Sequence, residues 1–292
     1  MKIRFVTLGC KLNFAESSAL GKVLLSRGHQ RALLSEVPDL CVVNTCSVTD
    51  AADHKDRQAI NQLHRKYPNA IIVVTGCYAQ LQPEQISHIE GVDYVLGQNE
   101  KYDIPALVEE IEQQLLNRPS PIANCQSPIA DRIRVAAIRE VEEFHGVRSG
   151  DDRTRCFIKV QDGCNYFCTY CTIPYARGKS RNPKIEEVLQ NAQEAIDQGV
   201  KELILTGVNI GDFGRSTGES FIDLLRALDN LQPLASNLSP LASSYRIRIS
   251  SCEPNLLTDE IIDFVAKSKH FAPHFHIPLQ SGSNEVLAIM KR

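Results

Sequence analysis

The sequence predicts an α/β protein: an open parallel sheet in a three-layer N-terminal domain, followed by an incomplete (β/α) partial barrel. Short runs of apolar residues, typical of strands buried on both faces, alternate with longer segments that have helical periodicity. This alternation occurs twice, in residues 1–116 and 153–292, and a linker, residues 117–152, separates the two blocks. The second block holds about four β/α units, which are too few to close a barrel.

The N-terminal block contains strand and helix candidates in alternation. The strand candidates are short and mostly apolar, and they cover residues 3–8, 40–44, 71–75 and 94–96. The helix candidates have apolar residues three or four positions apart, and they cover residues 15–27, 51–66 and 102–115. Because parallel strands need long crossover connections, we expect the helices to cover both faces of the sheet.

The second block repeats this alternation. Its strand candidates are residues 155–160, 202–206, 245–250 and 274–277. Its helix candidates are residues 185–198, 221–231, 258–267 and the segment starting at 283. Gly199 fits a helix C-terminus and Thr258 a helix N-cap. Within the linker, residues 133–144 could form a strand or hairpin on either domain.

The composition sets limits on the function. The 292 residues carry 32 Lys and Arg against 35 Asp and Glu, a formal net charge of −3, which excludes a globally basic nucleic-acid-binding protein but allows a local basic patch. The longest purely apolar run is five residues, 70–74, whereas a membrane span needs about 20, and the N-terminus lacks a secretory signal. We therefore expect a cytoplasmic protein. In a reducing compartment its ten cysteines indicate metal binding or catalysis.

Three cysteines lie close together directly after the predicted strand 155–160. Cys164, Cys168 and Cys171 have C-x3-C-x2-C spacing. Three thiolates can hold three irons of a four-iron cluster and leave the fourth iron open to a small ligand. Structural zinc usually takes four protein ligands, and no fourth Cys or His lies nearby in the sequence. The spacing favours an iron–sulfur cluster, with a zinc knuckle or reduced structural thiols as the alternatives.

Three further cysteines each follow a different predicted strand of the N-terminal sheet. Cys10, Cys46 and Cys77 come shortly after the first, second and third strands, and Gly9 and Gly76 precede two of them. Open parallel sheets bind ligands at the carboxyl ends of their strands, so these cysteines are expected to share one edge. This placement predicts a second metal site, although single loop cysteines are often incidental.

Basic and glycine-rich loops complete the pattern. Arg177, Lys179 and Arg181 follow the C-x3-C-x2-C motif and suit contacts to RNA phosphates, with a solvated loop as the alternative. A glycine-rich turn begins at Gly207, after a strand. Its spacing does not match a dinucleotide fingerprint, but a turn at this end of a barrel suits backbone contact with a small ligand.

These motifs resemble a known enzyme family. The C-x3-C-x2-C loop, with an aromatic residue before its third cysteine, resembles the radical S-adenosylmethionine (radical SAM) superfamily. Residues 7–13, 44–49 and 75–77 are similar to the three cysteine motifs of the methylthiotransferases, and residues 177–178 and 276–283 resemble barrel segments of that family. The first two motifs are most similar to the branch that acts on N6-threonylcarbamoyladenosine in tRNA. The family's last barrel strands and its tRNA-binding β domain do not occur in this sequence, so we expect a truncated enzyme.

The resemblance implies two 4Fe-4S clusters and S-adenosyl-L-methionine as cofactors. The implied cluster ligands are Cys164, Cys168 and Cys171 for the SAM-binding cluster, and Cys10, Cys46 and Cys77 for an auxiliary cluster. The implied SAM contacts are the backbone of Tyr170, Gly207, Ser250 and Gln280. The tRNA contacts are expected at Arg177, Lys179 and Arg181.

The resemblance also implies the reaction and its partners. One SAM supplies a methyl group, and a second is split to a radical that removes hydrogen from C2 of the modified adenosine at position 37. Sulfur insertion then gives the 2-methylthio derivative. The partners are an ANN-decoding tRNA, an electron donor such as flavodoxin or ferredoxin, and a sulfur donor that the sequence does not identify. The alternatives are another two-cluster radical SAM enzyme, acting on isopentenyladenosine in tRNA or on a ribosomal protein, and a non-catalytic metal- or RNA-binding module.

Overall fold

The structure is a computed structural model that describes residues 1–116, 132–150, 155–232 and 245–292. It divides into two compact units. The first unit comprises Met1–Val141 together with Tyr175–Arg177, and the second comprises Glu142–Pro174 and Gly178–Arg292. The segment expected as a linker, 117–152, is therefore shared between the units where it is described. Every helix in the described ranges is too short or too polar to cross a bilayer.

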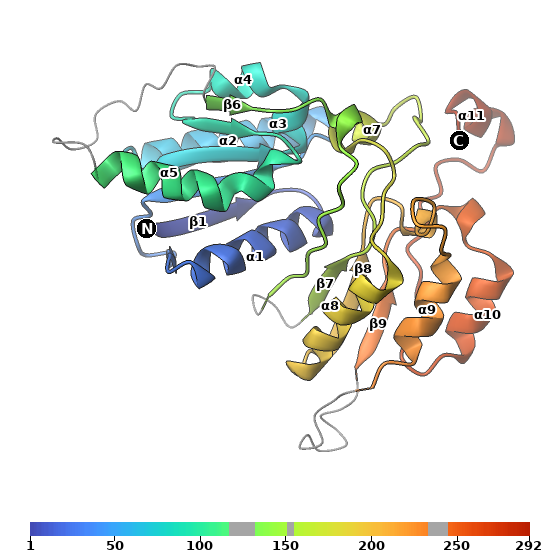
Figure 1. Ribbon diagram of the computed structural model, residues 1–292. Coiled ribbons are helices and arrows are strands. Elements are labelled where there is room, and N and C mark those ends of the chain that lie inside the picture. The colour runs from blue at the N-terminus through green and yellow to red at the C-terminus, as the bar shows by residue number, and fades with distance from the viewer. Residues whose placement is uncertain (117–131, 151–154, 233–244) are drawn as a thin grey trace. The chain divides into compact units, whose positions relative to one another are not determined.

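The first unit contains a six-stranded sheet in which every neighbouring pair is parallel, as expected (Figure 1). Its spatial order is β2-β1-β3-β4-β5-β6. In chain order the strands are β1 (Lys2–Thr7), β2 (Gln30–Arg31), β3 (Leu40–Thr45), β4 (Ile71–Gly76), β5 (Tyr94–Leu96) and β6 (Ile133–Arg134). Thr7 lies beside Asn44, and Asn44 lies beside Thr75, so β1, β3 and β4 end at nearly the same level.

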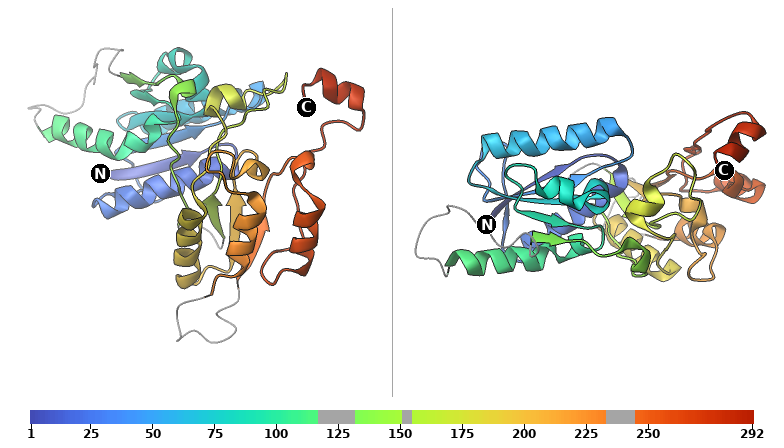
Figure 2. Two further views of the ribbon diagram at one scale, coloured as in Figure 1. Left: turned by 45° about the vertical axis from the view of Figure 1, so that its right-hand side comes forward. Right: turned by 90° about the horizontal axis from the view of Figure 1, so that it is seen from above.

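Helices cover both faces of this sheet, which gives the expected three layers (Figures 1 and 2). α1 (Lys11–Ser26) and α5 (Ile104–Leu116) cover one face, where Leu20 and Leu107 pack against Val42 and Val73. The opposite face is covered by α2 (Asp50–Lys66), α3 (Cys77–Leu81) and α4 (Pro83–Ser87). Alternate residues of β3 and β4 enter the two cores, as the two-residue period of a strand requires.

The strand order places a topological switch point between β1 and β3. The chain leaves β1 through α1 toward β2, on one side of β1, whereas it leaves β3 through α2 toward β4, on the other side. The two connections therefore diverge at the carboxyl ends of β1 and β3. In open parallel sheets ligands bind in the crevice at such a point.

The second unit contains a three-stranded parallel sheet in the order β7-β8-β9. Its strands are β7 (Cys156–Lys159), β8 (Glu202–Thr206) and β9 (Arg246–Ile249). One face is covered by α8 (Ile185–Asp197), α9 (Phe221–Asp229) and α10 (Asp259–Lys267), while α11 (Asn284–Ile289) ends the described chain (Figure 1). Apolar residues of the sheet and of these three helices form one core. The architecture is the expected partial barrel of β/α units.

In the second unit, two predicted helix ends are confirmed and one predicted strand is wrong. Thr258 caps α10 by accepting a hydrogen bond from the Ile261 amide, and Gly199 follows α8 with a φ of +83°, both as predicted. The predicted strand 274–277 is wrong. Two isolated bridges occur here instead, one between Phe271 and Ile247 of β9 and one between His276 and Ser251. Pro273 lies between the two bridges and has no N–H with which to join them into a ladder.

Two smaller differences concern the first unit. The short strand β6 falls in the segment expected as linker, and it joins the edge of the sheet beside β5. The helices α3 and α4 have five residues each, too few for the periodicity that revealed the longer helices.

Candidate metal centres

The structure brings Cys10, Cys46 and Cys77 to the carboxyl edge of the first sheet, at the switch point. Cys10 is the N-cap residue of α1, Cys46 directly follows β3, and Cys77 is the first residue of α3. Cys46 and Cys77 are buried, whereas Cys10 is exposed. Each side chain therefore has its position set by a different connection of the same sheet.

Two glycines allow the three cysteine backbones to approach one another. Gly9 has a φ of +92°, and a Cβ added there would lie 2.6 Å from Cys46 Cβ and 2.8 Å from its Sγ. Gly76 has a φ of +102°, and a Cβ there would collide with the backbone carbonyl of Thr45. Both positions need a left-handed backbone and an absent side chain, so glycine is required beside this site.

Polar side chains contact each cysteine of this group. Gln98 Nε2 donates to Cys77 Sγ at 3.1 Å, and the Cys46 amide donates to Asp56 Oδ2 at 2.8 Å. Cys10 Sγ lies 3.9 Å from Asn13 Oδ1. Burial raises the pKa of the Asp56 carboxyl to about 7. Neither Gln98 nor Asp56 could be predicted from the sequence, because neither belongs to a cysteine motif.

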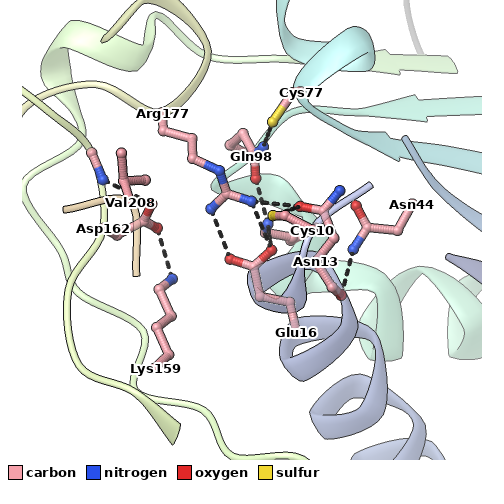
Figure 3. Close-up of polar contacts among 12 residues, drawn as sticks. Cys10, Asn13, Glu16, Asn44, Cys77, Gln98, Lys159, Asp162, Arg177 and Val208 are labelled. Atoms are coloured by element: carbon pink, nitrogen blue, oxygen red, sulfur yellow. Dashed lines mark hydrogen bonds and ion pairs between the residues drawn. The ribbon is translucent and has the colours of Figure 1, made fainter. Parts of the chain in front are cut away.

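A buried ion network lies next to this group and consists of Glu16, Lys101 and Arg177. Figure 3 shows the contact between Glu16 and Arg177. The Glu16 carboxylate accepts from Lys101 Nζ at 2.5 Å and from Arg177 Nη1 at 3.1 Å, and all three side chains are at most 2% exposed. Arg177 Nη2 also donates to Asn13 Oδ1 at 2.7 Å. Arg177 was expected to contact RNA. That expectation is corrected here, because a buried and ion-paired guanidinium is not presented to a nucleic acid.

The buried thiols of Cys46 and Cys77 are hard to ionise without a metal. Burial raises the pKa of Cys46 to about 11, and negative charge on Cys77 or Cys10 raises it further. Burial also raises the pKa of Cys77, while the positive charges of Arg177 and Lys101 oppose that rise. Since a metal binds thiolates, loading this site must release protons.

The donor sets fit a cluster better than a single ion. Within the described ranges, no three Cys, His, Asp or Glu side chains are close enough to share one metal ion. A four-iron cluster is wider than one ion and takes one thiolate on each of three irons, so its ligands stand further apart. Three soft sulfur donors on glycine-lined backbone match that requirement.

The second group, Cys164, Cys168 and Cys171, lies in the loop that follows β7. The Cys164 amide donates to Gly178 O at 3.0 Å, and the Cys171 amide donates to Cys168 O at 3.0 Å, which fold the loop into a compact turn. Burial raises the pKa of Cys164 to about 11, and the neighbouring charges of Asp212, Cys171 and Cys168 raise it as well. The three thiols are therefore close enough to influence one another electrostatically.

Gln161 fixes this loop and was not predicted from the sequence. Its buried amide donates through Nε2 to Gly163 O at 2.7 Å. Its Oε1 accepts from the backbone amides of Val208 and Asn209, at 3.0 and 2.9 Å, in the glycine-rich turn after β8. One side chain thus connects the cysteine loop to the turn that begins at Gly207.

The residues expected to contact SAM lie on several loops of the second unit. Gly207 packs against Gln161, Ser250 follows β9, and Gln280 is exposed in the segment before α11. The Ser250 hydroxyl is buried and makes no hydrogen bond within the described chain, which leaves it available for a ligand. Tyr170 is 47% exposed and its hydroxyl accepts from Arg292 at 2.6 Å.

The remaining basic residues of the expected RNA patch differ in exposure. Arg181 is 8% exposed, and its guanidinium contacts Asp162, Glu143 O and Lys179 O. Asp162 also pairs with the buried Lys159 at 2.7 Å (Figure 3). The expectation that Arg181 contacts RNA is therefore corrected as well. Lys179 is exposed, so it alone of the three expected cations presents its side chain to solvent.

Comparisons with known proteins find similarity over nearly the whole chain. Residues 2–97 match the family described as "Uncharacterized protein family UPF0004", and residues 158–292 match the radical SAM superfamily. The chain is 38% identical over 99% of its length to a threonylcarbamoyladenosine tRNA methylthiotransferase MtaB of Bacillus subtilis, and 34% identical over 100% to an MtaB of Aquifex aeolicus. It spans 60% and 66% of the length of these two relatives.

More distant relatives and solved structures extend this result. A tRNA-2-methylthio-N(6)-dimethylallyladenosine synthase of Carboxydothermus hydrogenoformans is 28% identical over 98% of the chain and 62% of that relative. Among solved structures, the radical SAM methyltransferase TsrM of Kitasatospora setae matches with a TM-score of 0.65 and 16% identity, over 98% of this chain and 62% of that one, which shows a shared fold. Both cysteine groups lie inside the regions that the two family models match. The N-terminal part of the chain therefore matches the UPF0004 family and its C-terminal part the radical SAM superfamily, and over nearly its whole length the chain is similar to MtaB methylthiotransferases.

Proposed function

We propose that the chain is the cluster-binding part of a tRNA methylthiotransferase that places a methylthio group on C2 of N6-threonylcarbamoyladenosine. The observation that carries this proposal is the presence of two separate groups of three cysteines, each gathered at the carboxyl edge of its own sheet. A radical SAM enzyme with only one cluster has no need of the first group. The MtaB relatives support tRNA as the substrate class.

The first unit would hold the auxiliary cluster through Cys10, Cys46 and Cys77. The buried Cys46 and Cys77 would exclude water from two of its three ligands, and Cys10, at the exposed side, would leave the site open to an incoming group. The Cys46 amide is held by Asp56, so this backbone is fixed before a metal binds. A preformed ligand set reduces the conformational cost of loading.

The second unit would hold a SAM-binding cluster through Cys164, Cys168 and Cys171. When bound, that cluster with SAM supplies the one-electron chemistry that an unreactive aromatic C–H bond requires. Gln161 would keep the cysteine loop and the Gly207 turn in a fixed relation, so that both contact the same ligand. The Tyr170 backbone, Ser250 and Gln280 complete the proposed SAM contacts.

The proposed partners follow from this reaction. Lys179, which is exposed, is the proposed contact to tRNA phosphate, since a lysine neutralises a phosphate without a fixed geometry. An electron donor such as flavodoxin or ferredoxin would reduce the clusters. A tRNA substrate also places the reaction in the cytoplasm.

The number of clusters provides the direct test. We would measure iron and sulfide per chain after anaerobic reconstitution, and compare a variant with Cys164, Cys168 and Cys171 changed to Ala. About eight irons falling to about four would support two independent clusters. About four irons falling to none would leave one cluster, and the proposal would then be wrong for the first unit.

The substrate needs a separate measurement. Nucleosides from tRNA of cells that carry or lack this gene would be analysed by mass spectrometry. We expect the methylthio derivative of threonylcarbamoyladenosine to depend on the gene. If the derivative of isopentenyladenosine depends on it instead, the substrate assignment is wrong while the reaction class stands. If neither depends on it, the methylthiotransferase proposal fails.

A further inference from the structure

The side-chain amide of Gln98 has only one possible orientation. Lys101 Nζ contacts the oxygen Oε1, and an ammonium group can donate but not accept hydrogen bonds. The nitrogen Nε2 must therefore face the other neighbour, Cys77 Sγ, at 3.1 Å (Figure 3). The Gln98 backbone amide is also held, since it donates to Gln80 Oε1 at 2.8 Å. An N–H donor is thus aimed at the sulfur of Cys77 by groups that are themselves fixed.

Two positive charges lie behind Gln98. In the buried ion network the cations Lys101 and Arg177 share the carboxylate of Glu16. All three side chains are at most 2% exposed, so water screens this charge poorly. The side-chain nitrogen of Asn13 donates to Leu8 O and Thr45 O, so its oxygen Oδ1 faces Arg177. The same oxygen lies 3.9 Å from Cys10 Sγ, and Asn13 therefore connects the network with Cys10. Lys101 and Arg177 both interact electrostatically with Cys77, and their positive charge favours an anion at that position.

A thiolate-bound iron–sulfur cluster is such an anion, and it becomes more negative when it is reduced. Hydrogen bonds to the sulfurs of a cluster and the net charge around it are two of the main determinants of its reduction potential. Hydrogen-bond donors aimed at the sulfurs and positive charge near the cluster both favour the reduced cluster. Gln98 supplies the donor, and the buried ion network supplies the charge.

We propose that Gln98, oriented by Lys101 and backed by Arg177, is a positioning residue that raises the reduction potential of a cluster bound by Cys10, Cys46 and Cys77. This inference rests on the proposed function, because it requires a cluster in the first unit. It assigns the buried ion network a role in tuning that cluster. Neither the cysteine motifs nor the family matches single out Gln98 or Lys101.

The test uses the full chain with Cys164, Cys168 and Cys171 changed to Ala, so that only the first unit can hold iron. After reconstitution with iron and sulfide, the reduced cluster is followed by electron paramagnetic resonance in a redox titration. Gln98→Leu removes the donor, and Gln98→Glu keeps nearly the same shape but replaces the donor by a negative charge. Gln113→Glu, at an exposed position of α5, makes the same charge change away from the cysteines.

We expect Gln98→Leu to lower the reduced-to-oxidised ratio at a fixed potential about tenfold, which equals about 59 mV for a one-electron couple. Gln98→Glu should lower the ratio further, whereas Gln113→Glu should leave it unchanged. A purely structural role for Gln98 predicts the opposite order, because Glu is the closer replacement in shape. Thermal unfolding of the metal-free variants, measured by circular dichroism, shows whether each one folds.

The outcomes separate this inference from the proposed function. A background variant that binds no iron would overturn the two-cluster proposal and this inference with it. A background variant that binds about four irons, with the same potential in all three Gln98 forms, would overturn only the role of Gln98. If Gln98→Leu fails to fold, the comparison of Gln98→Glu with the parent chain decides the question in the same way.

Discussion

Replacing Glu16 by Gln is expected to destabilise the first unit more than removing the cation Arg177. Glu16 lies on α1, is fully buried and is the only carboxylate of the buried ion network, in contact with Lys101 at 2.5 Å and Arg177 at 3.1 Å. Glu16→Gln keeps the shape of the side chain but leaves two buried cations without a counter-charge. Breaking a buried ion pair in this way costs about 3–5 kcal/mol.

Arg177→Met is the informative comparison. It leaves the pair between Glu16 and Lys101 intact and removes the second of the two cations that contact Glu16. The loss is then that of the hydrogen bonds to Glu16 and Asn13, about 1–3 kcal/mol. A change of Glu109 to Gln, in an exposed pair with Arg27, is the matched control and should cost less than about 1 kcal/mol.

Hydrogen exchange followed by mass spectrometry measures this difference in the first unit alone. Peptides from β1, β3 and β4 report the free energy with which the central strands open. In Glu16→Gln their slowest amides should exchange roughly 140- to 4,000-fold faster, and in Arg177→Met roughly 5- to 140-fold faster. If both variants accelerate exchange equally, or if neither does, Glu16 is not the shared counter-charge of the two cations and the argument is refuted.

Three further predictions concern other features of the chain. Gly76→Ala should abolish iron binding by the first unit, because the new Cβ would collide with backbone atoms. The control Gly28→Ala also has a positive φ, +89°, but has open space around it, so it should cost only about 1–3 kcal/mol of strain and retain iron. Equal iron contents in the two variants would contradict this prediction. Burial raises the pKa of the Asp93 carboxyl in the folded state. Its contribution to the free energy of unfolding is therefore full below its ordinary pKa and is lost as the pH rises through its pKa in the folded state. Asp93→Asn should therefore gain urea stability relative to the wild type as the pH rises above about 4, and a constant difference would refute the argument. Gln161→Leu should make a chelator remove iron from the second unit faster, and unchanged kinetics would show that its hydrogen bonds do not hold the cysteine loop.

Much of the fold could be predicted because its signals are local. The strands β3, β4, β5 and β8 are continuous apolar runs, and the sequence places each of them within a residue or so. The register then follows from the parallel arrangement, which is why three cysteines from separate motifs could be placed on one edge. The strand predicted at 274–277 does not form, because Pro273 directly before it has no N–H and the bridges at Phe271 and His276 on either side of it stay isolated.

The candidate sites were predicted only in part because their supporting contacts are long-range. Arg177 lies 161 residues from Glu16 in the sequence, and a basic segment near a cysteine motif indicates RNA binding as readily as a buried ion pair. Gln161 and Gln98 are single glutamines outside any motif, so no spacing rule selects them. What they do depends on which backbone and sulfur atoms the folded chain places around them.

The two cysteine groups also depend on the fold to different degrees. Cys164, Cys168 and Cys171 come from one loop of eight residues, and the local turn at Cys168 already brings two of them together. Cys10, Cys46 and Cys77 come from three connections, and they meet only when the strands pair in register and the glycine at position 9 allows close approach. Metal affinity that depends on a folded ligand set contributes its free energy to folding. A cluster in the first unit would therefore stabilise the whole sheet, whereas the second group can retain its ligand geometry with far less of the unit in place.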